Sequence, residues 1–89
     1  MEKALDEVMD DILSRPNVTG CLFADQQGLC LGSRGKVSPS TTGFVVALSD
    51  LSCKIQPNEK PPIIHLEADN RQCIIQKQEN ITTAIFKRI

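Results

Sequence analysis

The order of helical and strand patterns along the 89 residues is the feature that most limits the fold of this chain. Apolar residues recur at helical spacing in two segments and alternate in five short ones, in the order helix, two strands, helix, three strands. Short polar turns separate the last three strands, which is typical of an antiparallel meander. The pattern predicts a single domain over residues 1–89, an α/β (α+β) sandwich whose five-stranded antiparallel sheet carries helices on its faces.

The expected elements are bounded by prolines, glycines and polar turns. The first helix ends before Pro16, because the residue that precedes a proline avoids the α region. The second helix is expected over residues 39–55, with Ser38 as its cap. Strands are expected over residues 18–25, 29–34, 63–68, 72–77 and 81–87. Gly32 and Gly35 lie at the second strand, where they indicate a bulge or a close backbone contact.

The second helix is apolar around most of its circumference. The main apolar stripe, which is expected to face the sheet, consists of Phe44, Leu48, Leu51 and Ile55. Three further apolar residues widen the arc: Val45, Val46 and Cys53. An arc of this width indicates that the helix contacts two neighbours. The second neighbour is either the first helix or another subunit.

The sheet of this pattern is open, and an open sheet has two edge strands whose backbone groups can bind another strand. Pro61 and Pro62 block only the entrance of the strand over residues 63–68, so the rest of that strand keeps its backbone donors. The sequence therefore predicts that a partner binds this strand and the second helix. The expected interface residues are Val45, Val46, Ser49, Ser52, Cys53, Ile63, Ile64, His65 and Leu66.

Charge and hydropathy exclude two classes of partner. The net charge is −1, acidic and basic residues are mixed along the chain, and the three Phe residues are scattered, all of which disfavours nucleic-acid binding. No segment has the run of about 20 apolar residues that crosses a bilayer, so no direct membrane insertion is expected. The acidic N-terminal segment lacks the apolar run of a signal peptide, which indicates a cytosolic protein.

Residue types that carry catalysis are scarce in this sequence. The one histidine, His65, lies in the middle of a predicted strand, and the four cysteines are dispersed without a C-x-x-C pair. These residues do not supply the three or four ligands that a metal site needs, and a cytosolic chain keeps its thiols reduced. No catalytic residue, metal or cofactor is therefore expected. The enzyme alternative is a thiol enzyme that uses Cys30 or Cys21, although no base or orienting group accompanies either thiol.

Three stretches of the sequence resemble a known family. They are residues 20–35 (GCLFADQQGLCLGSRG), residues 66–70 (LEADN) and residues 74–77 (IIQK), the last of which is followed by Ile81 and Thr82. Their order and spacing resemble those of the hepatitis B X-interacting protein family of small Ragulator subunits, and the similarity covers nearly the whole chain. The predicted element order is also similar to that of the roadblock class of small adaptor domains.

The resemblance implies a scaffold function and a set of partners. Roadblock domains pair through their second helix and the strand that follows it, which here are residues 39–55 and 63–68. The implied partner is another roadblock-domain subunit in a heterodimer, held by a lipidated Ragulator wrapping subunit. This assembly would dock Rag GTPases and support TOR kinase recruitment at the late endosome or lysosome surface, to which the cytoplasmic chain is recruited through its partners. The alternative is a roadblock-type light chain of a motor, or a regulator of a small GTPase.

Overall fold

The computed structural model describes residues 2–55, 60 and 62–89 and contains the predicted helices and strands in the predicted order. The helices are α1 (Glu2–Leu13), the short 3-10 helix Pro39–Thr41 and α2 (Thr42–Cys53). The strands are β1 (Val18–Ala24), β2 (Cys30–Gly35), β3 (Ile64–Glu67), β4 (Arg71–Gln78) and β5 (Ile81–Arg88). The predicted second helix over residues 39–55 thus covers a 3-10 turn and an α-helix. The N–H of Ser40 donates to Ser38 Oγ at 3.3 Å, so Ser38 caps the 3-10 turn.

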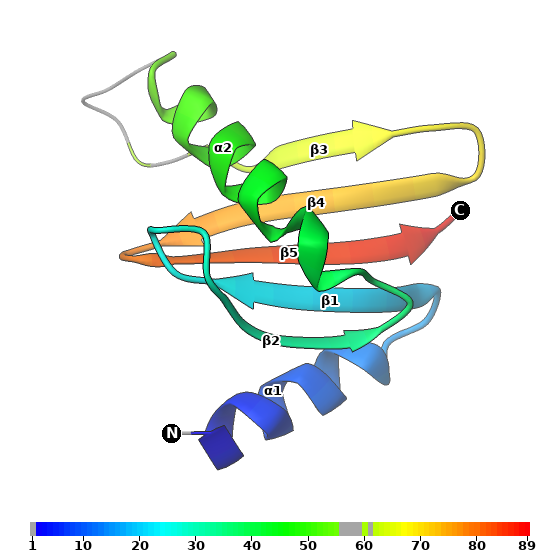
Figure 1. Cartoon of the computed structure of the whole chain (residues 1–89). Helices are drawn as coiled ribbons and strands as arrows, with labels where there is room; N and C mark the ends of the chain where they lie inside the picture. Colours follow the sequence, from blue (N-terminus) through cyan, green and yellow to red (C-terminus); the bar gives the residue numbers. More distant parts are fainter. Residues whose placement is uncertain (1, 56–59, 61) are drawn as a thin grey trace.

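All five strands form one antiparallel sheet in the order β2-β1-β5-β4-β3. β1 and β5 therefore lie inside the sheet, and β2 and β3 form its edges, as Figure 1 shows. The predicted five-stranded antiparallel architecture is confirmed. The strand that was expected over residues 63–68 is an edge strand, as predicted, and Pro61 at its entrance lies outside the described residues.

The core has two layers because successive residues of each strand point to opposite faces of the sheet. On one face, Met9 and Ile12 of α1 pack with Cys21 of β1. On the other face, α2 packs against the central strands. The buried cluster there consists of Leu22, Ala24, Val45, Val46, Ile75 and Ala84. Burying each large apolar side chain in these clusters contributes about 1.5–3 kcal/mol relative to leaving it in water.

The orientation of α2 on the sheet corrects the prediction from the sequence. The stripe that was expected to face the sheet is largely turned away from it, with Phe44, Leu51 and Ile55 exposed. Val45 and Val46, which were expected to meet a partner, lie in the core instead. The reason is steric. Beneath the helix, the sheet presents the small side chains of Ala24 and Ala84 among larger ones. The compact Val, Ser and Thr side chains of α2 pack closely against this surface.

The predicted irregularity at the β1–β2 hairpin is also confirmed. Ala24 pairs with Cys30 while Phe23 pairs with Gly32, so Leu31 is the extra residue of a bulge. A Cβ at Gly32 would lie 2.9 Å from Met9 Cε, which shows how closely α1 approaches β2. Gly35 has a φ of +78°, and a Cβ there would collide with the carbonyl oxygen of Thr19.

Replacement of Gly35 by alanine is expected to lower the free energy of unfolding by at least about 2 kcal/mol, because the side chain adds both backbone strain and a collision with backbone. Gly43→Ala is the matched control, since a Cβ at this helical glycine meets nothing within 4 Å. It is expected to raise stability by up to about 1 kcal/mol. Urea denaturation followed by circular dichroism measures both changes, and equal effects at the two positions would contradict the strained turn.

Candidate functional site

The outward side of α2 carries the largest exposed apolar side chains of that helix. Phe44 is 65% exposed, Leu51 60% and Ile55 77%. Phe44 and Leu51 are seven positions apart, so they lie on one side of α2, and Ile55 follows two residues after the helix ends. Leu48 lies between them on the same side and is partly buried against the core cluster.

The edge strand β3 adds further apolar surface next to this side of α2. Ile64 pairs with Ile75 and Leu66 pairs with Cys73, so Ile64 and Leu66 point to the face of the sheet that α2 covers. Leu66 is 42% exposed, and Ile63, just before the strand, is 62% exposed. Within the described residues, β3 pairs only with β4, so its other side offers an open strand edge.

The two elements form one surface. Leu48 of α2 and Ile64 of β3 both pack, partly buried, against the same core cluster, and Figure 1 shows α2 crossing the sheet toward β3. We name this the α2/β3 surface and define it by Phe44, Leu51, Ile55, Ile63 and Leu66. Exposed apolar side chains that gather beside an unpaired strand edge are typical of a protein–protein interaction site.

The structure buries some of the interface residues that were predicted from the sequence and exposes others. On α2, Val45, Val46 and Ser49 are buried against the chain's own sheet, and Ser52 and Cys53 are half-buried. On and next to β3, Ile63, His65 and Leu66 are exposed and Ile64 is half-buried. The β3 half of the prediction therefore lies where a partner can reach it. The α2 half is replaced by the exposed residues Phe44, Leu51 and Ile55, which the sequence pattern assigned to the opposite side.

Polar pairs flank the α2/β3 surface. Asp50 of α2 lies 3.6 Å from Lys77 Nζ of β4. His65 and Glu67 of β3 point to the other face of the sheet, where His65 Nε2 lies 3.5 Å from Glu67 Oε1. Both pairs are at least partly solvent-accessible, so they contribute little to stability, and only the Asp50–Lys77 pair lies on the face of the sheet that α2 covers.

The cysteines have the surroundings of structural residues. Cys21 is fully buried beneath α1, and its burial raises the pKa of its thiol, an effect that the nearby Arg34 only partly offsets. Burial also raises the pKa of the Cys73 thiol. A raised pKa lowers the thiolate population that nucleophilic attack needs. Cys30 lies on β2, at the opposite edge of the sheet from His65, so this histidine does not serve it as a base.

Within residues 2–55, 60 and 62–89, no three His, Cys, Asp or Glu side chains are grouped so that they could hold a metal ion. The same part of the chain contains no helix with both the length and the apolar character that crossing a membrane requires.

Comparison with known proteins agrees with the resemblance seen in the sequence. The family model of Ragulator complex protein LAMTOR5 matches residues 1–87. The chain belongs to the LAMTOR5 family. A LAMTOR5 homolog from Nematostella vectensis is 39% identical over 88 residues, which cover 98% of this chain and 97% of the relative. LAMTOR5 from Xenopus tropicalis is 34% identical over 88 residues, with the same coverage of both chains.

Solved structures place the LAMTOR5-family chain in the roadblock fold. The Roadblock/LC7 domain from Streptomyces avermitilis superposes with a TM-score of 0.81 at 16% identity, covering 93% of this chain and 77% of that domain. MglB from Myxococcus xanthus superposes with a TM-score of 0.85 at 12% identity, covering 98% of this chain and 71% of MglB. At these identities the likeness concerns the fold alone, and the predicted roadblock architecture is confirmed.

Proposed function

We propose that this chain is a non-enzymatic scaffold subunit of a Ragulator-like complex, and that it pairs with another roadblock-domain subunit through the α2/β3 surface. The observation that carries the proposal is the position of Phe44, Leu51 and Ile55 in solvent beside an open strand edge. Membership in the LAMTOR5 family, whose named relatives are Ragulator complex proteins, supports the choice of assembly.

A partner bound at this surface would pair with the open strand edge and cover the exposed apolar side chains at the same time. A strand of the partner laid along β3 would take up the open backbone edge and extend the sheet. A helix of the partner packed beside α2 would cover Phe44 and Leu51 of that helix and Ile55 just after it. A stable interface usually buries about 1,600 Å² in total, and contacts with both the helix and the strand would contribute to that area.

The same family membership supports a proposal for the wider assembly. We propose that the pair is held by a lipidated Ragulator wrapping subunit, which brings it to the late endosome or lysosome surface. There the assembly would anchor Rag GTPases and support TOR kinase signalling. The chain itself would reach that membrane only through its partners.

The test is affinity purification of the full chain at native expression, followed by identification of the chains that elute with it. The expected result is stoichiometric recovery of one other roadblock subunit, together with the wrapping subunit and Rag GTPases. Recovery of motor subunits in their place would support the motor light chain and contradict the Ragulator assignment. A chain that elutes alone, as a monomer, would contradict the scaffold proposal altogether.

A further inference from the structure

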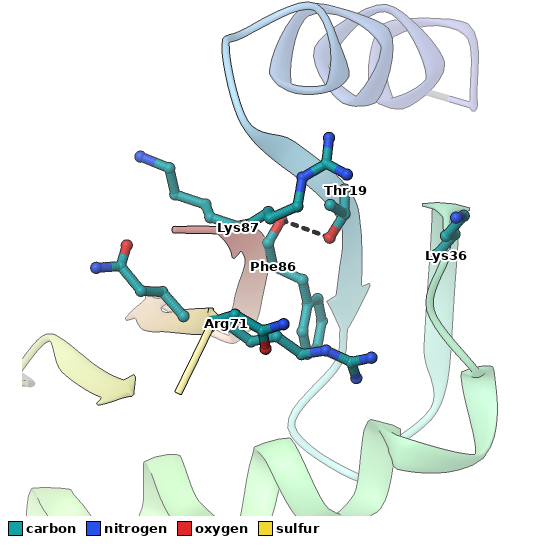
Figure 2. Close-up of a pocket in the computed structure, with 8 residues that line it drawn as sticks. Thr19, Lys36, Arg71, Phe86 and Lys87 are labelled. Atoms are coloured by element: carbon teal, nitrogen blue, oxygen red, sulfur yellow. Dashed lines mark hydrogen bonds between the residues drawn. The ribbon is translucent and has the colours of Figure 1, made fainter. Parts of the chain in front are cut away.

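One end of the sheet contains a hollow of about 270 Å³, and none of the five residues that define the α2/β3 surface lines it. Four strands contribute to it: Thr19 comes from β1, Lys36 follows β2, Arg71 begins β4, and the end of β5 supplies Phe86, Lys87 and Arg88. Figure 2 shows Phe86 in the middle of this group, with Lys36 and Lys87 on opposite sides of it. The turn residue Asn70 and Gln72 of β4 complete the wall, and Gln72 Nε2 donates to Glu67 Oε1 of β3 at 3.0 Å.

The charge of this hollow differs from that of the whole chain. Four of the chain's ten lysines and arginines line it, and no Asp or Glu does, although the net charge of the chain is −1. Three cations elsewhere have carboxylate partners: Arg15 pairs with Asp11, Arg34 with Asp6 and Lys77 with Asp50. Within the described residues, the structure pairs none of the four cations of the hollow with a carboxylate.

Two of these cations directly oppose each other. Arg71 pairs with Arg88 across the β4–β5 ladder, so their side chains leave the same face of the sheet next to one another. Like charges in this cross-strand position destabilise a sheet. Because no carboxylate in the described part of the chain forms an ion pair with either arginine, a bound anion would relieve the repulsion.

The backbone around the hollow is held by hydrogen bonds. Lys36 N–H donates to the Thr19 carbonyl oxygen at 2.9 Å, and Thr19 Oγ1 donates to the Phe86 carbonyl oxygen at 3.2 Å. The second of these bonds is drawn in Figure 2. Arg88 N–H donates to the Asn17 carbonyl oxygen at 2.7 Å. These bonds fix the strand ends, so the flexible stems of the cations start from a rigid frame.

We propose that this hollow binds a phosphate group. A phosphate group carries up to two negative charges and offers several acceptor oxygens, which match the donors of the two arginines and two lysines that line the hollow. Arginine binds phosphate oxygens through two parallel N–H donors, and lysine adds a point charge. The hollow lies slightly below the range of about 300–1,000 Å³ that is usual for drug-sized ligands, so it suits a compact phosphate better than an extended acidic peptide. The site is independent of the proposed pairing function.

The test titrates inorganic pyrophosphate into the full chain, labelled with ¹⁵N, at constant ionic strength set with chloride. The expected result is saturable chemical-shift change at the amides of Thr19, Lys36 and Gln72, and a rise in Tm of at least about 2 °C. The double variant Arg71→Gln, Arg88→Gln is expected to bind at least about tenfold more weakly. It is also expected to melt higher than the wild type when no phosphate is present, because the repulsion between the two arginines is gone.

The control variant Lys54→Gln, Lys60→Gln removes the same charge from exposed positions outside the hollow, and its affinity is expected to be unchanged. An equal loss in both variants, or the absence of saturable shifts in the wild type, would overturn the proposal. A well-dispersed spectrum establishes that each variant is folded, and the variant Arg71→Lys, Arg88→Lys, which keeps the charge, should retain part of the affinity.

A second arm separates the two sources of the phosphate group. Vesicles of phosphatidylcholine, with and without a phosphoinositide, are mixed with the chain and sedimented. Phosphoinositide-dependent sedimentation that pyrophosphate reverses would identify a lipid headgroup, and pyrophosphate binding without sedimentation would identify a soluble phosphate. An acidic peptide that binds where pyrophosphate fails would show that the ligand class is wrong.

Discussion

A Val46→Asp variant is expected to be unfolded as an isolated chain. Val46 is only 6% exposed and belongs to the core cluster between α2 and the sheet. A carboxylate in this position loses its water without gaining a partner, and the apolar contacts of the valine are lost as well. The expected loss is more than about 4 kcal/mol, which is most of the stability of a small domain. Far-ultraviolet circular dichroism and urea denaturation measure the result.

Ala47→Asp is the matched control, because it places the same charge on the next residue of the same helix, where the side chain is exposed. Its expected cost is below about 1 kcal/mol. A folded Val46→Asp chain beside an unfolded Ala47→Asp chain would show that α2 is turned the other way on the sheet. That outcome would restore the orientation that the sequence pattern first indicated.

The sheet could be predicted from the sequence because each strand carries its own signal. Strands β4 and β5 are bounded by polar turns and alternate in character, so their register follows once the turns are placed. The predicted limits of the strands differ from the observed ones by at most one residue, as is usual where hydrogen-bond ladders begin or finish.

The orientation of α2 could not be predicted in the same way because two sides of the helix are apolar. The sequence pattern alone predicted that the helix turns its larger apolar residues toward the sheet, because the main apolar stripe of a helix usually faces the core. Which side lies inward depends on what the sheet offers, and here the small residues Ala24 and Ala84 favour close packing against Val45, Val46 and Ser49. These alanines lie about 20 to 40 positions away from α2 in the sequence, so no local pattern contains this information.

The basic hollow could not be predicted from the sequence, for a related reason. Lys36, Arg71, Lys87 and Arg88 come from the ends of three strands, and only the order β2-β1-β5-β4-β3 brings them to one end of the sheet. The one available signal was the predicted β4–β5 hairpin, whose register places Arg71 opposite Arg88. A cross-strand pair of like charges, read from a hairpin register, is therefore worth checking in small domains of this type.

A Leu51→Asp variant is expected to remain folded and to lose its roadblock partner. Leu51 is 60% exposed, so the substitution adds a charge in water and is expected to cost the isolated chain less than about 1 kcal/mol. In the proposed pair the same charge would be buried between two helices without a partner. The expected weakening is at least about 100-fold, which is the usual size for a central interface residue. Co-purification with the roadblock subunit, followed by titration calorimetry, measures it.

Val8→Asp is the control for this prediction, because Val8 is a comparably exposed apolar residue (48%) on the other helix, α1. Its affinity for the roadblock partner is expected to stay within about threefold of the wild type. The pair of variants separates two explanations of the exposed leucine. If Leu51→Asp binds normally, the apolar side of α2 is not the pairing surface, even though the chain belongs to a family of complex subunits. If both variants lose the partner, the interface extends over α1 as well, and the open edge of β3 is not what determines where the partner binds.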